Sequence, residues 1–193
     1  MISFLSTNIA AFLVRKKAVS PDMEEVCEYG IAAIVSSAIS FSLLFLIASI
    51  LGRFWEGLVF LACFSPLRRF TGGYHANSYF VCKTVFLSTF MVCVAMLPLL
   101  ENPSTVCRII CAGILLFDFF IVFAFAPIES KNKPLNDTEK FHFRRCAIWT
   151  AGIQVAVGNI MLYFSFPIYS MIVLTTTVVA IAMVVEIVKQ RSH

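Results

Sequence analysis

The chain has 193 residues, of which 60% are hydrophobic and 13% are charged. A soluble domain usually carries about 25% charged residues, and here the surplus apolar residues fall in long runs. This composition excludes an ordinary soluble domain and predicts an all-α, polytopic membrane protein. We therefore interpret the net charge of +4 as a topology signal and do not expect a nucleic-acid partner.

The seven cysteines cannot all pair, because their number is odd. They are scattered along the chain and form no Cys-x-x-Cys motif, so the sequence suggests neither a zinc ribbon nor a thioredoxin-like redox site. We expect no metal and no cofactor. Six of the seven fit the role of small apolar residues at helix interfaces. The exception is Cys82, whose surroundings are described below.

The N-terminal segment, residues 1–19, predicts an amphipathic helix that lies in the plane of the membrane. Its apolar part, Ile2–Val14, is too short to span a bilayer and is followed by Arg15-Lys16-Lys17. Such a basic anchor favours contact with an anionic lipid surface. A signal peptide fits less well, because its charges should precede the apolar core.

The rest of the chain, residues 20–188, is expected to form one helical bundle, so we treat 1–193 as a single membrane domain. Ser20-Pro21-Asp22 has the features of a helix start, with Ser20 able to cap and Pro21 suited to the first turn. The helix should continue through Ile31–Leu51. This uncharged run would extend about 31 Å, which is one bilayer core.

The second predicted crossing, Phe54–Ser65, is short. As a helix it reaches only about 18 Å, so we expect it to be tilted or partly re-entrant. It contains Glu56, which is either a functional or pairing group inside the membrane or a carboxylate facing the interface.

Four further spans follow, which makes about six in total. The fourth crossing contains Asp118, for which structural pairing with Arg108 or another chain is favoured over a role in mechanism. The next crossing contains Gly152 and Gly158, which could permit close helix packing. The predicted spans are Thr84–Leu100, Ile109–Ala126, Cys146–Phe166 and Ile168–Val188, and a basic loop, Pro127–Arg145, separates the middle two.

Basic residues orient the predicted crossings. With six crossings and a cytoplasmic N-terminus, only Arg53 and Arg108 of the 15 Lys and Arg residues fall outside the cell. The positive-inside rule therefore places both termini, the stretch 65–83 and the loop 127–145 on the cytoplasmic side.

The stretch 65–83 holds the residues with the most distinctive chemistry. His75 and Cys82 are seven positions apart, about 10 Å along a regular helix, so they can interact only if the chain bends. Gly72-Gly73 supplies backbone freedom before the histidine. Cys82 would then lie in the first turns of the next helix, which favours a thiolate. These features indicate thiol catalysis at the cytoplasmic edge of the membrane.

A family resemblance rests on the same residues. The run Arg68-Arg-Phe-Thr-Gly-Gly-Tyr-His-Ala76 followed by Cys82 resembles the signature of the accessory gene regulator protein B (AgrB) family. The run Ala126-Pro-Ile-Glu-Ser-Lys-Asn-Lys-Pro-Leu135 resembles that family's second motif. The chain length, the hydropathy pattern and the basic central loop also agree with this family.

The resemblance implies a membrane cysteine endopeptidase of a Gram-positive bacterium, located in the cell membrane. Such an enzyme cuts the C-terminal tail from an AgrD-like precursor peptide and joins the new end to an internal side chain, giving a cyclic thiolactone or lactone for quorum sensing. By position, Cys82 matches the nucleophile and His75 the catalytic histidine. A third catalytic residue and the presence of a homodimer stay open.

We expect the basic residues and glycines of the two motifs to bind the precursor, because family precursors carry acidic tails. A purely topological role for the basic residues is the alternative. Backbone amides near Asn77 and Ser78 could stabilise the oxyanion. The predicted substrate-binding residues are Arg68, Arg69, Gly72, Gly73, Lys131 and Lys133.

Two other functions remain open from the sequence. A transporter would use Glu56 and Asp118 as intramembrane carboxylates, and Cys82 would be inert. A non-enzymatic membrane scaffold would need neither His75 nor Cys82.

Overall fold

The computed structural model describes residues 2–72, 79–100, 103–128 and 136–191. Every regular element in these ranges is a helix, which confirms the all-α class. By packing, the chain divides into two compact units, Met1–Ile47 and Ala48–His193. Each unit is described by itself.

The first unit contains α1 (Ile2–Arg15), the short 3-10 helix η1 (Pro21–Met23) and most of α2 (Glu24–Ile50). Thr7 of α1 donates a hydrogen bond to the Glu28 carboxylate of α2 at 2.6 Å. Pro21 opens η1 as predicted, but the Ser20 side chain makes no capping hydrogen bond.

The helix α1 presents large apolar side chains outward. Phe4, Leu5 and Phe12 are exposed, whereas the small residues Ser6 and Ala10 are buried. An outward apolar surface on a short helix suits an in-plane position at a bilayer. That position stays a prediction.

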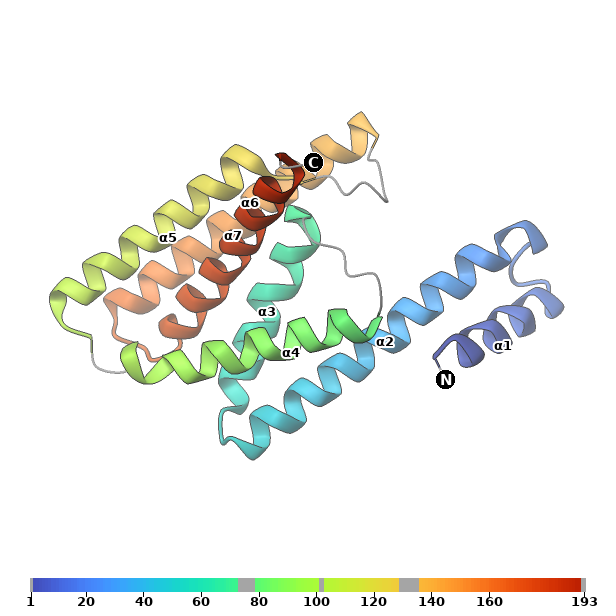
Figure 1. Ribbon diagram of the computed structural model, residues 1–193, viewed down its shortest axis with the longest axis horizontal. Coiled ribbons are helices and arrows are strands. Elements are labelled where there is room, and N and C mark those ends of the chain that lie inside the picture. The colour runs from blue at the N-terminus through green and yellow to red at the C-terminus, as the bar shows by residue number, and fades with distance from the viewer. Residues whose placement is uncertain (1, 73–78, 101–102, 129–135, 192–193) are drawn as a thin grey trace. The chain divides into compact units, whose positions relative to one another are not determined.

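The second unit is a helical bundle. Helices α5, α6 and α7 lie side by side, α3 packs against α6 and α7, and α4 contacts α3 and α7 (Figure 1). A short 3-10 helix, η2 (Leu97–Leu100), continues α4. The helices are α3 (Phe54–Thr71), α4 (Tyr79–Met96), α5 (Thr105–Phe125), α6 (Asp137–Tyr163) and α7 (Tyr169–Arg191).

Five helical segments of the described chain are long and apolar enough to cross a membrane: Pro21–Ile50, Val81–Leu100, Thr105–Phe125, Asp137–Tyr163 and Tyr169–Gln190. The protein is therefore a multi-pass membrane protein. The sixth predicted crossing, α3, is not among them. It has 18 residues, more than the short crossing that was predicted, and it carries Glu56, Arg68 and Arg69; its tilted or re-entrant course in a membrane stays a prediction.

Two helix boundaries differ from the prediction. Helix α3 does not end at Ser65 but continues through Pro66 to Thr71. A proline inside a helix deprives the preceding turn of a donor, and here the buried Gln154 side chain of α6 donates to the Cys63 carbonyl at 2.9 Å. This hydrogen bond ties α3 to α6 one turn before the proline; the carbonyl that loses its helical donor to Pro66 is that of Ala62, four residues earlier.

The other boundary concerns the predicted basic loop 127–145, whose last nine residues, 137–145, are the first turns of α6. The Asn136 backbone N–H donates to the Glu139 carboxylate at 3.1 Å, which is one half of a capping box. Asn136 followed by Glu139 was therefore a helix-start signal that the loop prediction overlooked. Lys140, Arg144 and Arg145 lie on this helix.

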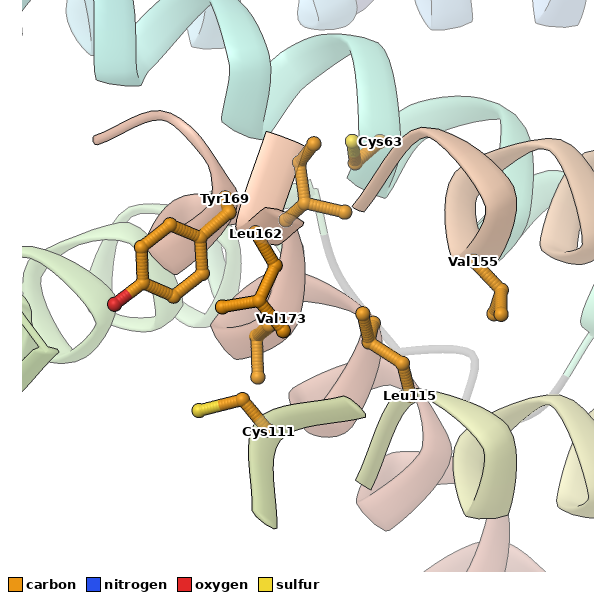
Figure 2. Close-up of a cluster of buried hydrophobic side chains, with 8 residues drawn as sticks. Cys63, Cys111, Leu115, Val155, Leu162, Tyr169 and Val173 are labelled. Carbon is orange, nitrogen blue, oxygen red and sulfur yellow. The ribbon is translucent and has the colours of Figure 1, made fainter. Parts of the chain in front are cut away.

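Two clusters of buried side chains show how the helices run. The first joins Cys63 of α3, Cys111 and Leu115 of α5, Val155 and Leu162 of α6, and Tyr169, Ile172 and Val173 of α7 (Figure 2). The second joins Leu67 of α3, Val122 of α5, Ala147 and Ala151 of α6, and Val179 and Met183 of α7, with Ala126 and Ile128 of the following segment.

The order of these contacts fixes the helix directions. Residue numbers in α3, α5 and α7 rise from the first cluster to the second, whereas those in α6 fall. Helices α3, α5 and α7 are therefore parallel, and α6 is antiparallel to them. The ends of the three parallel helices and the start of α6 meet at one end of the bundle, which we call the motif end. The predicted topology requires this arrangement.

Candidate active site

The two arginines at the end of α3 have different surroundings. Arg69 is exposed, whereas Arg68 is half-buried beside Leu67, whose side chain lies in the second cluster. The Arg68 guanidinium donates from Nη1 to the Gly72 carbonyl at 2.6 Å. Arg68 thus stabilises the end of its own helix, where carbonyl groups lack helical partners.

Gly72 forms a tight backbone junction with Ile128. The Ile128 N–H donates to the Thr71 carbonyl at 2.8 Å, and Gly72 and Ile128 form a parallel β-bridge. Gly72 has φ +72°, and a Cβ at this position would lie 2.2 Å from the Ile128 carbonyl oxygen. Only glycine fits both the dihedral angle and the space. The two sequence motifs, 68–76 and 126–135, are therefore joined through their backbones.

Cys82 lies in the first turn of α4 and is exposed, as predicted. Aromatic contacts align α4 with α3: the Phe86 ring is 5.4 Å from Phe64, and the Phe90 ring is 5.3 Å from Phe60. The two helices therefore pack against each other at these four rings. Cys82 lies one turn before Phe86 on α4.

Arg68 adds positive charge in the surroundings of Cys82, which is followed in the chain by Lys83. Arg68 interacts electrostatically with Cys82 and, secondly, with Glu186 of α7. A guanidinium close to an accessible thiol at a helix start is the kind of environment in which reactive cysteines occur. The structure thus joins Arg68 to Gly72 and places Cys82 within electrostatic range of Arg68.

Several predicted site residues lie outside the described residues. These are His75, Gly73, Lys131, Lys133, Asn77 and Ser78. The pairing of His75 with Cys82 therefore stays a prediction, as does the role of the two lysines in precursor binding. Sequence alone places His75 three residues after the Gly72 junction.

A second histidine–cysteine pair was missed by the sequence reasoning, which singled out the stretch 65–83 for its combination of a histidine, a cysteine, paired arginines and Gly-Gly. The Cys146 sulfur lies 3.6 Å from Nε2 of His142 on α6. Their i, i+4 spacing was a usable signal, because such residues are neighbours on a helix. No group of three potential metal-ligating side chains occurs among the described residues.

The carboxylates of the transporter alternative both have local partners. Glu56 forms a 3.0 Å ion pair with Arg53, as expected for a pairing group. Asp118 is buried and accepts a 2.8 Å hydrogen bond from the Thr177 hydroxyl of α7. Its partner in the structure is thus Thr177 rather than the predicted Arg108. Each contact is explained by structural pairing of the carboxylate and does not require a transport function.

These features define a multi-pass helical membrane protein with an accessible thiol at a helix start, beside an arginine and a rigid glycine junction. The chain belongs to the accessory gene regulator B (AgrB) family: the sequence model of that family matches residues 6–185. The family is involved in accessory gene regulator peptide processing. The resemblance drawn from the two motifs is confirmed.

Two curated relatives are named as AgrB-like proteins. One, from Clostridium perfringens (strain SM101 / Type A), is 30% identical over 173 residues, which is 86% of this chain and 80% of the relative. Another, numbered 2 and from Clostridium perfringens (strain 13 / Type A), is 30% identical over 176 residues with the same coverage. No solved structure matches the chain.

Proposed function

We propose that the protein is a membrane cysteine endopeptidase that cleaves the C-terminal tail of an AgrD-type precursor and promotes cyclisation of the remainder to a thiolactone or lactone. The observation that carries the proposal is the exposed Cys82 thiol in the first turn of α4. It interacts with Arg68 in a chain that belongs to the AgrB family.

The chemistry follows from the nucleophile. His75 takes the proton of Cys82, and the sulfur attacks the scissile carbonyl. The C–N bond breaks, His75 returns the proton to the leaving amine, and the precursor is held as a thioester. An internal thiol or hydroxyl of the precursor then attacks the thioester carbonyl, which closes the ring and releases the Cys82 sulfur. Exclusion of water would favour this capture over hydrolysis.

The covalent step gives a direct test. A co-expressed AgrD-type precursor whose internal Cys or Ser is replaced by alanine should be cut but cannot cyclise. A precursor–enzyme adduct should then accumulate on Cys82, survive denaturing electrophoresis, and disappear after hydroxylamine treatment. Mass spectrometry of the Cys82 peptide measures it. Complete tail release with no adduct on any cysteine would contradict the thioester.

The same experiment distinguishes the proposed endopeptidase from a transporter. A transporter that uses Glu56 and Asp118 forms no covalent adduct, and Cys82→Ser would leave its activity unchanged. The local partners of both carboxylates give this alternative no support beyond their presence in the sequence.

We further propose that both termini and the motif end face the cytoplasm. The motif end gathers Arg68, Arg69, Arg144 and Arg145, and Lys or Arg residues are enriched on the cytoplasmic side of short loops. A positive field there would concentrate an acidic precursor tail. Arg69, Gly73, Lys131 and Lys133 remain the proposed binding residues. For Arg68 and Gly72, which the sequence also assigned to binding, we propose a structural role, because Arg68 donates to the Gly72 carbonyl and Gly72 pairs with Ile128.

The topology predicts opposite labelling of two loops. In a background free of other reactive thiols, Asn102→Cys should react in intact cells with a membrane-impermeant maleimide, whereas Gly73→Cys should react only after lysis. Labelling is measured by gel shift, and a cytoplasmic marker protein serves as the control for leakage. Rapid labelling of Gly73→Cys in intact cells would reverse the proposed orientation.

A further inference from the structure

We infer that Glu186 of α7 is a positioning residue of the proposed active site: its carboxylate shares the Arg68 guanidinium with Cys82 and so limits the reactivity of the resting thiol. The inference rests on the proposed function, in which Cys82 is the nucleophile. Glu186 itself takes no part in making or breaking a bond. The three residues lie on three different helices, α7, α3 and α4.

The packing of α7 places Glu186 beside the end of α3. Leu67 of α3 is buried in the second cluster together with Met183 of α7, and Ile187 packs against the same cluster. Glu186 lies three residues after Met183 and directly before Ile187, so it is on the side of α7 that borders this cluster. It is half-buried there. Arg68 directly follows Leu67, and the ends of the parallel helices α3 and α7 meet at the motif end.

Arg68 interacts with two groups that can carry a negative charge. Its half-buried guanidinium interacts electrostatically with Cys82 and with Glu186. Glu186 is the only acidic residue of α7, and a carboxylate in a membrane helix is expected to have a partner. The Gln190 side chain donates from Nε2 to Glu186 Oε1 at 3.3 Å, which helps to orient the carboxylate. Glu186 is therefore a held counter-charge of Arg68.

The guanidinium is tethered independently of Glu186. Arg68 Nη1 donates to the Gly72 carbonyl at 2.6 Å. A guanidinium has five N–H donors, so this bond leaves donors for an anion. Removal of the Glu186 carboxylate should therefore leave Arg68 at the motif end and let it turn toward Cys82.

A shared guanidinium acts differently in the charged and neutral states of Cys82. As a thiol or a thioester, Cys82 is neutral, and Glu186 is the anion that balances Arg68. A half-buried cation without such a partner would be costly. When the thiolate forms, it competes with Glu186 for the same guanidinium. A nearby opposite charge favours the thiolate, so Glu186 withholds part of this stabilisation and slows the resting thiol.

Other charged side chains of these three helices are less suited to this role. Arg69 of α3 and Lys189 of α7 are exposed, where water and salt screen their charges. Lys83, directly after Cys82, is half-buried and has the same sign as Arg68. Among the charged residues of α7, only Glu186 can oppose the effect of Arg68 on the thiolate.

Glu186→Gln removes the charge and keeps the size of the side chain. We expect this variant to speed alkylation of Cys82 by iodoacetamide about three- to tenfold at neutral pH, because the thiolate is the reactive form. The reagent is uncharged, so the local field does not attract it. Purified full-length protein in lipid nanodiscs is treated without precursor, and the Cys82 peptide is measured by mass spectrometry. Glu186→Asp keeps the carboxylate and should react at nearly the wild-type rate.

Three controls separate this role from general effects. Asp137→Asn removes one negative charge from an exposed position at the motif end and should not change the rate. Cys93, buried on the same helix as Cys82, should stay unlabelled, because its labelling would report opening of the fold. In an Arg68→Gln background, Glu186→Gln should have no further effect, since it acts through the guanidinium. If Glu186→Gln does not accumulate in membranes, Glu186→Met takes its place.

Several results would overturn the inference. One is an unchanged alkylation rate in Glu186→Gln. Another is an equal acceleration in Asp137→Asn, which would indicate a general field, or in the Arg68→Gln background, which would indicate direct repulsion of the thiolate. Acceleration together with labelling of Cys93 would assign Glu186 to the fold alone. The proposed function fails separately, if Cys82→Ala still releases the tail of an AgrD-type precursor.

Discussion

Replacing Cys82 with alanine should abolish tail cleavage, whereas replacing Cys146 with alanine should leave it close to wild type. Cys82 is exposed in the first turn of α4 and interacts with Arg68. Cys146 has an imidazole 3.6 Å from its sulfur, but it lies outside the two motifs. The comparison is informative because Cys146 has the only histidine–cysteine contact seen among the described residues.

The experiment co-expresses each variant with an AgrD-type precursor and follows the tail by electrophoresis, after membrane levels are matched by immunoblot. His75→Ala should resemble Cys82→Ala, and His142→Ala should resemble wild type. Cys93→Ala serves as a control, because it removes a buried thiol and should leave cleavage unchanged. Loss of cleavage in Cys146→Ala, with cleavage retained in Cys82→Ala, would move the proposed active site to α6.

Arg68 and Arg69 should differ strongly on substitution, although both were predicted from the sequence to bind the precursor. We expect Arg68→Lys to lower processing about 10- to 100-fold and Arg69→Lys to lower it less than threefold. Arg68 is half-buried and bonds the Gly72 carbonyl, and a hydrogen bond from a charged group contributes about 1.5–3 kcal/mol. A lysine keeps the charge but not the planar fork of donors.

Processing rates and membrane levels of both lysine variants are measured over a range of precursor expression. If Arg69 binds the acidic tail, excess precursor should restore Arg69→Lys, and a neutral-tail precursor should abolish the difference from wild type. Excess precursor should not restore Arg68→Lys, because its defect lies in the geometry of the site. Equal, fully restorable losses in both variants would instead assign both arginines to precursor binding.

The helical class, most helix positions and the location of Cys82 at a helix start could be predicted from the sequence, because they depend on local apolar runs and punctuating residues. The continuation of α3 through Pro66 to Thr71 could not, since a proline usually signals a helix end and only the tertiary packing shows that the helix goes on. The start of α6 could have been predicted from the sequence, because Asn136 and Glu139 form a local helix-start signal.

The candidate site was predictable by residue type but not by contact. The motif pointed to Arg68, Gly72 and Cys82. Nothing in it distinguished the two arginines, because their different exposure is a result of the tertiary fold. The bond between Ile128 and Thr71 joins main-chain groups 57 positions apart, and main-chain groups are the same in every sequence. For that reason, the sequence analysis gave the second motif only a role in binding the precursor through its charged side chains.

The Gly72–Ile128 junction also determines which sequence changes the site can accept. A main-chain donor can be supplied by any residue except proline, so position 128 could exchange one buried aliphatic side chain for another without weakening the bond to Thr71. Position 72 has no such freedom, since its φ of +72° and the nearby carbonyl exclude a side chain. Among related sequences, position 72 should therefore stay glycine and position 128 should never be proline. No correlated substitutions between the two positions are expected.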